Sequence, residues 1–365
     1  MFSEKDLQEL LDYSAESQIL SVYLSTDPTK TTTEAAKIQL RNALKTVDLP
    51  DDVQAVEDYV NLEYDWFAKG LVIFSCQEEG LFQAHPFNLP VPDRVFVGDR
   101  PVLRPLIRLI NTFTGWSVVL VDKQSARFFS FDFGELDKRY SVSGEEVKQT
   151  KRGGGNAMPG RMGGSDASGK VENIIDQNIK EVIDLAVDFF TKNHIRRIMI
   201  GGTEENIARF REELPKSWQS LVVGQFPMSM TANDSEVLSQ ATQEALTAQE
   251  KINNALVSQA ITLAAKGAHG VIGLIDTLNA IHEGRLKTLL VLSDVEEHGF
   301  RCKGCGYLSG QEMEICPFCG INFEKIDNAI EMAVRQALRN NAEVRIVVED
   351  EQLAKAGKIA GILRY

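Results

Sequence analysis

The sequence has no apolar run of the 18 or so residues that a membrane-spanning helix needs, and its first residues, MFSEKDLQELL, are charged where a signal peptide is apolar. It has only five cysteines and five histidines among 365 residues. Positive charge is also in deficit, because 39 Lys and Arg stand against 52 Asp and Glu, a formal net charge of -13. These absences predict a cytoplasmic protein without membrane contact and exclude a uniformly basic nucleic-acid binder. Any contact with RNA has to come from a local basic segment.

Familiar catalytic patterns are missing as well. The phosphate-binding pattern GxxxxGK[ST] does not occur, and the chain continues with Val171 after Lys170, without the Ser or Thr that would hold Mg²⁺. The five histidines are dispersed, and no Ser/His/Asp or Cys/His constellation stands out. An unrelated hydrolase or a redox zinc protein is therefore the least favoured class.

Apolar residues make up 43% of the chain, which is enough for two or three domains that each have a hydrophobic core. Strand-like and helix-like patterns alternate along the whole chain, which predicts the α/β class with three consecutive mixed α/β domains. The predicted domains are residues 1–114, 115–235 and 236–365. The patterns behind this division are a hairpin at 71–87, strands at 19–25, 116–122, 126–133, 195–202 and 286–292, and helices at 33–45, 171–190, 236–266 and 323–340.

Four of the five cysteines form two CxxC pairs near the C-terminus, in the sequences CKGCG and CPFCG. Four thiolates at this spacing close a tetrahedral shell around Zn²⁺ and leave no position for a water. We therefore expect a structural zinc ribbon inserted into the last domain at residues 299–322, with no catalytic role for the metal. Its ligands are Cys302, Cys305, Cys316 and Cys319.

A glycine-rich segment at residues 151–170 reads KRGGGNAMPGRMGGSDASGK, with seven glycines in twenty residues. Glycine loses the most backbone entropy on ordering, so this segment is expected to form a long mobile loop before a helix. Four basic residues against one Asp give it a net charge of +3, which makes it the local basic segment of an acidic chain. One interpretation is a loop that enters an RNA-lined cavity, and the alternative is a surface loop without chemistry.

The order of these features resembles a known family. A basic glycine loop precedes a long amphipathic helix and a strand ending in Gly201-Gly202, and the chain closes with GKIAGILRY. Together with the cysteine insertion and the stretch VIGLIDTLNAIHEGRLKTLLVL at 271–292, this pattern resembles the class I translation termination factors of archaea and eukaryotes and their relative Pelota. The bacterial branch of this superfamily is the closest fit.

The resemblance implies that the loop acts at the peptidyl transferase centre. Family members carry a Gly-Gly-Gln tripeptide after a basic residue, and it helps water attack the ester of peptidyl-tRNA. The matching residues here are Lys151-Arg152 followed by Gly153, Gly154, Gly155 and Asn156, and no glutamine occurs between Gln149 and Gln177. A backbone amide can still stabilise the oxyanion, so hydrolysis stays open, although the missing glutamine favours its loss.

In the first domain of the family, an Asn-Ile-Lys-Ser sequence on a helix helps read stop codons. The corresponding helix here reads Ala36-Lys37-Ile38-Gln39, which argues against stop-codon decoding. Lys37 and Arg41 lie four residues apart and either contact RNA backbone or form an ordinary solvated face. The candidate RNA-binding residues are therefore Lys37, Arg41, Lys151, Arg152, Arg161 and Lys170.

Two functions follow from the resemblance. The first is a ribosome-associated factor for translation termination or ribosome rescue that hydrolyses peptidyl-tRNA through residues 152–156. The alternative is a non-hydrolytic, Pelota-like factor that binds the ribosome or RNA without decoding stop codons. Both imply the ribosome and tRNA as partners, and a translational GTPase that binds the C-terminal domain.

Overall fold

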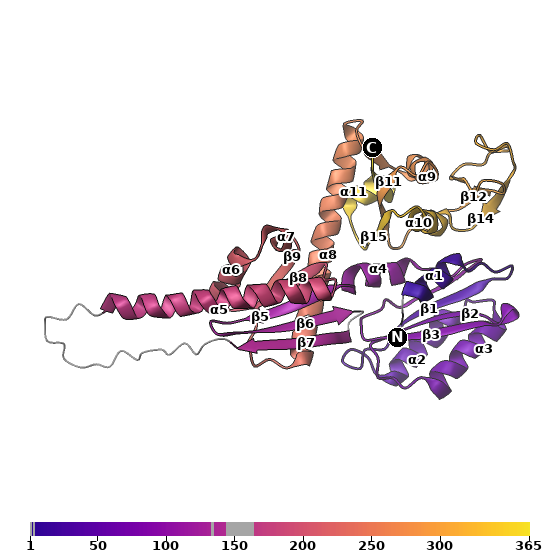
Figure 1. Cartoon of the computed structure of the whole chain (residues 1–365). Coiled ribbons are helices and arrows are strands. Elements are labelled where there is room, and N and C mark those ends of the chain that lie inside the picture. Colours follow the sequence, from indigo (N-terminus) through magenta and orange to yellow (C-terminus); the bar gives the residue numbers. More distant parts are fainter. Residues whose placement is uncertain (1, 3, 133–134, 144–163) are drawn as a thin grey trace. The chain divides into compact units, whose positions relative to one another are not determined.

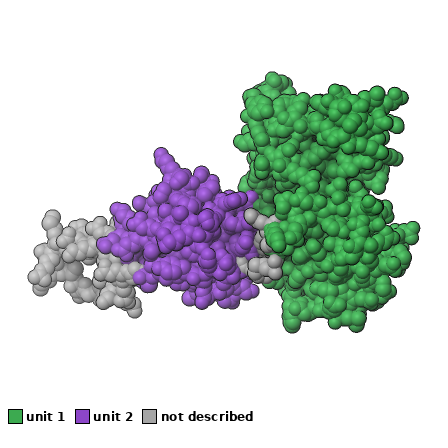
Figure 2. All heavy atoms as spheres, turned by 45° about the vertical axis from the view of Figure 1, so that its right-hand side comes forward, with its two compact units in different colours: residues 1–112, 249–365 green, residues 113–248 purple. Residues whose placement is uncertain are grey.

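The computed structural model describes residues 2, 4–132, 135–143 and 164–365, and within 164–174 it describes the backbone. The chain forms two compact units, residues 1–112 with 249–365 (unit 1) and residues 113–248 (unit 2), coloured separately in Figure 2. Both units combine sheets and helices, which confirms the predicted α/β class. The three domains with boundaries after residues 114 and 235 stay a prediction. Among the described residues, no helix is both long and apolar enough to cross a membrane.

The N-terminal part of unit 1 is a four-stranded antiparallel sheet in the order β3-β2-β1-β4. Its strands β1 and β2 are almost wholly buried, and helix α2 packs on them through Ala36, Leu40 and Leu44, which recur every four residues. The Thr32 hydroxyl accepts from the Ala35 amide at 3.2 Å and so begins α2. The elements are α1 (Glu4–Asp12), β1 (Ile19–Ser25), α2 (Thr33–Leu44), α3 (Pro50–Asp58), the π-helical turn η1 (Tyr59–Glu63), β2 (Gly70–Cys76), the 3-10 turn η2 (Gln77–Glu79), β3 (Leu81–Phe87), β4 (Arg94–Gly98) and α4 (Arg104–Phe113).

Unit 2 contains a five-stranded sheet in the order β7-β6-β5-β8-β9. The strands β5, β8 and β9 run parallel, and β6 and β7 pair antiparallel to their neighbours. The helices α5 and α6 cover one side of this sheet and share its apolar core. The elements are β5 (Trp116–Val121), β6 (Ser125–Asp132), β7 (Glu135–Ser143), α5 (Gly164–Lys192), β8 (Arg197–Gly202), α6 (Glu204–Glu213), α7 (Lys216–Gln219) and β9 (Val222–Pro227), followed by α8 (Asp234–Ala265), which continues into unit 1.

The predicted apolar face of α5 is buried against the sheet. Its core residues are Ile175, Ile179, Val182, Ile183, Ala186 and Phe190. Figure 1 shows α5 lying along the strands, with its first turns extending beyond them. The helix begins at Gly164, however, so the loop predicted over 151–170 was too long at its C-terminal end. Once a helix has formed, each residue added at its end contributes one hydrogen bond without a new nucleation cost. The helix predicted from residue 171 onward can therefore continue toward the N-terminus, past Gly169 to Gly164.

The C-terminal part of unit 1 has a sheet in the order β10-β16-β11-β15, in which β11 and β15 are parallel. A smaller antiparallel sheet, β13-β12-β14, carries the cysteines. The helix predicted over 323–340 was wrong at its start, because residues 323–326 pair with β12 as strand β14. The elements are β10 (Gly270–Ile272), α9 (Leu274–His282), β11 (Leu286–Leu292), β12 (Gly299–Cys302), β13 (Leu308–Ser309), β14 (Phe323–Ile326), α10 (Ala329–Arg339), β15 (Glu343–Val347), α11 (Glu351–Lys355) and β16 (Ile359–Leu363).

Candidate functional site

The structure brings the four predicted zinc ligands together. The sulfur atoms of Cys302, Cys305, Cys316 and Cys319 all lie within 4.8 Å of one another. The sulfurs of Cys302 and Cys319 are 3.3 Å apart, and those of Cys305 and Cys316 are 3.6 Å apart. Four sulfurs at about 2.3 Å from a tetrahedral zinc are separated by roughly 3.8 Å, so the donor set fits this ion.

Two equivalent tight turns hold the cysteines in place. The Gly306 amide donates to the Cys302 carbonyl at 3.0 Å, and the Gly320 amide donates to the Cys316 carbonyl at 2.9 Å. Both glycines have φ of 74°, in the left-handed region where a side chain would be strained. The glycine that follows each CxxC pair is therefore required by the turn that aims the thiols inward.

The thiols also have altered acidity. Burial raises the pKa of Cys302, but hydrogen bonds from backbone amides and neighbouring thiols outweigh it and bring the pKa to about 6. The Gly304 amide supplies one of these bonds, 3.4 Å from the Cys302 sulfur. Burial and the neighbouring thiols raise the pKa of Cys305 to about 12. A bound cation would favour the thiolate form of its cysteine ligands.

The candidate metal-ligand set consists of the four cysteines and includes no histidine among the described residues. His298 is exposed and lies outside the cluster, in agreement with its interpretation as a surface residue. The His282 ring instead packs beside the cluster, 4.4 Å from the ring centroid of Phe318 and 5.0 Å from that of Tyr307. The Tyr307 hydroxyl donates to the Asn279 side-chain oxygen at 2.6 Å, which attaches the cysteine sheet to α9.

The residues predicted for catalysis lie between β7 and α5. Gly153, Gly154, Gly155 and Asn156 are outside the described residues, as are the basic residues Lys151, Arg152 and Arg161. Lys170 belongs to the N-terminal part of α5. The described chain leaves the edge strand β7 at Ser143 and resumes at Gly164. In the chain, the predicted loop therefore connects the edge strand β7 to the long helix α5.

Lys37 and Arg41, the other predicted RNA-binding residues, both lie on α2. The Lys37 ammonium is 5.5 Å from the ring centroid of Trp66, so it takes part in a cation–π contact. Trp66 has φ of 62°, an uncommon conformation for a bulky residue. Arg41 is exposed. RNA binding by this pair stays a prediction.

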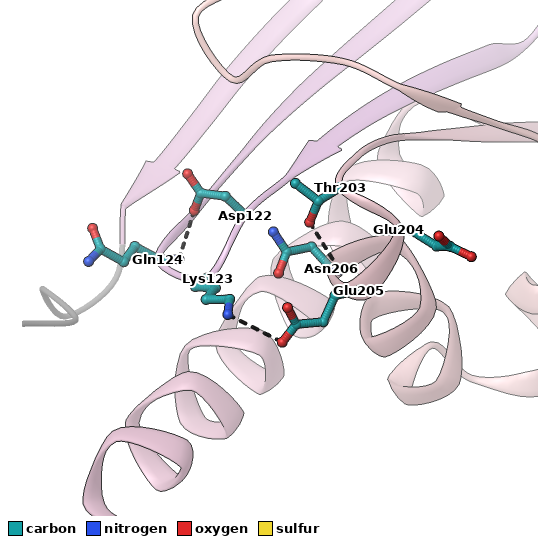
Figure 3. Close-up of a pocket in the computed structure, with 7 residues that line it drawn as sticks. All are labelled: Asp122, Lys123, Gln124, Thr203, Glu204, Glu205 and Asn206. Carbon is teal, nitrogen blue, oxygen red and sulfur yellow. Dashed lines mark hydrogen bonds and ion pairs between the residues drawn. The ribbon is translucent and has the colours of Figure 1, made fainter. Parts of the chain in front are cut away.

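A pocket in unit 2, which is not among the predicted sites, has a volume of about 670 Å³ and lies where β5 and β8 end and α6 begins (Figure 3). Asp122 follows β5, and its Oδ1 atom accepts from the amides of Gln124 and Ser125 at 2.7 and 2.6 Å. The Lys123 ammonium pairs with Glu205 at 3.2 Å. Three carboxylates, those of Asp122, Glu204 and Glu205, outnumber the one ammonium in the lining, so this pocket does not suit a nucleic-acid backbone.

A sequence signal for this pocket did exist in the polar residues directly after two strands, Asp122 and Thr203. The carboxyl ends of neighbouring parallel strands meet at one edge of a sheet, where α/β proteins commonly bind ligands. At this edge Gly202 allows the backbones of β8 and β5 to approach closely, because a Cβ there would lie 2.5 Å from the Val121 carbonyl oxygen. The pairing of β5 with β8 links residues about 80 positions apart, and periodicity alone does not predict it.

Residues 101–246 match the family model described as bacterial archaeo-eukaryotic release factor family 10, and this range spans α4 and nearly all of unit 2. No curated protein matches this sequence.

Solved structures with detectable similarity include the archaeal translation termination factor aRF1, at 18% identity, 99% coverage of this chain, 96% of that chain and a TM-score of 0.27. A model of ribosome-bound archaeal Pelota and ABCE1 matches at 12% identity over 100% of this chain and 94% of that chain, with a TM-score of 0.41. Dom34 from S. cerevisiae matches at 10% identity over 81% of each chain, with a TM-score of 0.40. Matches at this level of identity and superposition say nothing about activity. The resemblance to the bacterial branch of the archaeal and eukaryotic release factors is confirmed by the family model, to which residues 101–246 are similar.

Proposed function

We propose that this protein is a ribosome-associated factor of the release-factor type, which acts in translation termination or ribosome rescue in the cytoplasm. The observation that carries the proposal is the match of residues 101–246 to a release-factor family, because this range includes the whole segment between β7 and α5. The ribosome and tRNA are the partners that such a role requires. A translational GTPase that binds the C-terminal part of unit 1 belongs to the same proposal.

In this proposal the segment from Arg152 to Asn156 enters the peptidyl transferase centre. Glycines 153 to 155 let the backbone approach the ester carbonyl closely, and a backbone amide stabilises the oxyanion that forms when water attacks. The basic residues Lys151, Arg152, Arg161 and Lys170 neutralise nearby RNA phosphates. The acidic pocket of Figure 3 is unsuited to that task.

The missing glutamine favours a second candidate function, a Pelota-like factor that binds the ribosome without hydrolysis. Asn156 offers the same amide group on a side chain one methylene shorter, so it reaches less far toward an attacking water. Under this alternative, the basic glycine segment contributes binding energy only.

The cysteine cluster has a structural role in both candidates. Cys302, Cys305, Cys316 and Cys319 would hold one Zn²⁺ and so fix the short strands β12, β13 and β14. Four sulfur ligands saturate the ion, and the metal therefore supplies stability without activating a water.

One preparation of the full chain can separate the two functions. Sedimentation with programmed ribosomes through a sucrose gradient measures binding, and release of labelled peptide from stalled complexes measures hydrolysis. We expect Gly154→Ala to abolish release while binding persists, because a Cβ obstructs a conformation open only to glycine. Gly98→Ala is the matched control, since its new Cβ has no neighbour closer than 3.8 Å.

The charge of the segment is tested in the same assays. Replacing Lys151 and Arg152 by alanine should weaken sedimentation with ribosomes, whereas replacing the exposed Arg211 and Lys216 of unit 2 should leave it unchanged. Binding with background release would select the Pelota-like candidate. If neither binding nor release occurs with the wild-type chain, the proposed function is wrong.

A further inference from the structure

Unit 1 contains a cavity of about 110 Å³ whose lining includes none of the four clustered cysteines. Ser293 and Asp294 follow β11, and Val348 follows the parallel strand β15. Arg104 and Pro105, the first residues of α4, form the facing wall, and Figure 1 labels all three elements. The cavity therefore sits at the carboxyl ends of two parallel strands and at the N-terminus of a ten-residue helix.

Positive charge dominates the lining of this cavity. Three guanidinium groups, those of Arg94, Arg104 and Arg108, face a single carboxylate, that of Asp294. Asp294 pairs with Arg94 at 3.3 Å, and both side chains are more than half exposed, so this ion pair is weak and lies at the rim. Further in, Arg104 already pairs with the buried carboxylate of Glu331, which leaves Arg108 as the guanidinium of the lining without an ion-pair partner among the described residues.

Arg104 is only 1% exposed, yet one of its nitrogens lacks a hydrogen-bond acceptor. Its Nε atom donates to Glu331 at 3.2 Å, and its Nη1 atom donates to the carbonyls of Ser293 and Val295. Its Nη2 atom has no acceptor among the described residues, and the Glu296 carboxylate is 4.0 Å away. A buried donor without an acceptor costs free energy, so the native state gains if a ligand supplies one.

Arg108 lies one helical turn further along α4 and is also short of acceptors. Its guanidinium makes no hydrogen bond or ion pair with any residue that the structure describes. Burial lowers its pKa, and the carboxylates of Glu250 and Asp294 oppose this only through longer-range attraction. A half-buried, unpaired guanidinium beside a cavity is a natural partner for an oxyanion.

We propose that this cavity binds a small, phosphate-sized oxyanion, held by Arg104 and Arg108 at the N-terminus of α4. The volume corresponds to roughly four water molecules, which suits a tetrahedral anion and excludes a polynucleotide strand. The amides at the start of α4 contribute little, because the Leu103 amide already donates to the Glu331 carboxylate at 2.9 Å and Pro105 has no N–H, so the two arginines carry the site. The apolar side chains of Phe96 and Ile346 complete the walls and limit access of water, which strengthens the charge interaction. The ligand is free phosphate or the terminal phosphate of a small phosphomonoester.

Isothermal titration calorimetry on the full chain tests this site. Inorganic phosphate is titrated first, and ribose 5-phosphate second, to distinguish the free ion from a phosphomonoester. We expect saturable binding of one anion per chain and a loss of affinity of about tenfold or more in Arg108→Gln, because hydrogen bonds to charged groups are the strong ones. Arg211→Gln, an exposed arginine of unit 2, is the matched control and should bind like the wild type.

Asp294→Asn supplies a variant with the opposite expected sign. It removes the one competing carboxylate at an exposed position, so phosphate affinity should rise while the fold is preserved. Tighter binding in Asp294→Asn together with weaker binding in Arg108→Gln supports the proposal for either source of phosphate. Absence of saturable binding at millimolar phosphate, or equal affinity in both variants, overturns it. Arg108-dependent binding of an oligoribonucleotide without binding of phosphate overturns it as well and assigns the cavity to nucleic acid.

Discussion

Glu331 connects α10 to the start of α4, and replacing it by glutamine should destabilise unit 1 substantially. Glu331 lies in α10, is 4% exposed, and accepts from the Leu103 amide at 2.9 Å and from Arg104 Nε at 3.2 Å. The Arg335 side chain is 1% exposed, and its Nε atom lies 3.7 Å from Glu331 Oε1, the oxygen that accepts from the Leu103 amide. One carboxylate therefore balances two buried guanidinium groups.

The size of the effect follows from that arrangement. Removing one member of a buried ion pair costs about 3–5 kcal/mol, because the remaining charge stays buried without compensation. Arg335 keeps three carbonyl acceptors, on Leu10, Leu11 and Pro101, so we expect a loss near the lower end, about 3 kcal/mol. At a urea dependence of about 2 kcal/mol per molar, the unfolding midpoint should fall by about 1.5 M.

Urea unfolding followed by circular dichroism and by tryptophan fluorescence measures this loss. Glu283→Gln is the matched control, since Glu283 pairs with Arg285 at a partly exposed position and the pair should contribute less than about 1 kcal/mol. If Glu331→Gln lowers the midpoint no more than Glu283→Gln does, the buried network does not hold unit 1 together and the reasoning fails.

Three further predictions concern the metal, a glycine and a histidine. The purified chain should contain one zinc by mass spectrometry, which Cys316→Ser removes and Cys76→Ala retains; metal content that survives Cys316→Ser would contradict the four-cysteine site. Gly202→Ala should lower the thermal midpoint of unit 2, because its Cβ would lie 2.5 Å from the Val121 carbonyl oxygen at a φ of 152°, and an unchanged midpoint would argue against the close approach of β8 to β5. Burial lowers the pKa of His85 below 6.5, so the unfolded chain binds the proton first and stability is lost as pH falls below about 6.5; His85→Gln should flatten this pH dependence, which unfolding at pH 7.5 and 5.5 would measure.

The amino-acid sequence alone determined features that depend on neighbours along the chain. The two CxxC pairs and the glycines behind them specified a four-sulfur cluster, since each pair closes its own tight turn. The four-residue apolar spacing from Ile175 onward specified the buried face of α5 for the same reason, because helix geometry repeats locally. The basic glycine segment after Ser143 was one of the features behind the family resemblance, which the family model over 101–246 confirms.

Tertiary structure decided what depends on distant residues. Residues 323–326 continue a helical pattern in the sequence, yet they form β14 because β12 offers them hydrogen-bond partners. Glu331 and Arg104 are 227 positions apart, so no periodicity could pair them. The arginine-lined cavity arises from the same long-range packing, because α4, β11 and β15 meet only in the folded chain, and burial there leaves the Nη2 atom of Arg104 without a hydrogen-bond acceptor among the described residues.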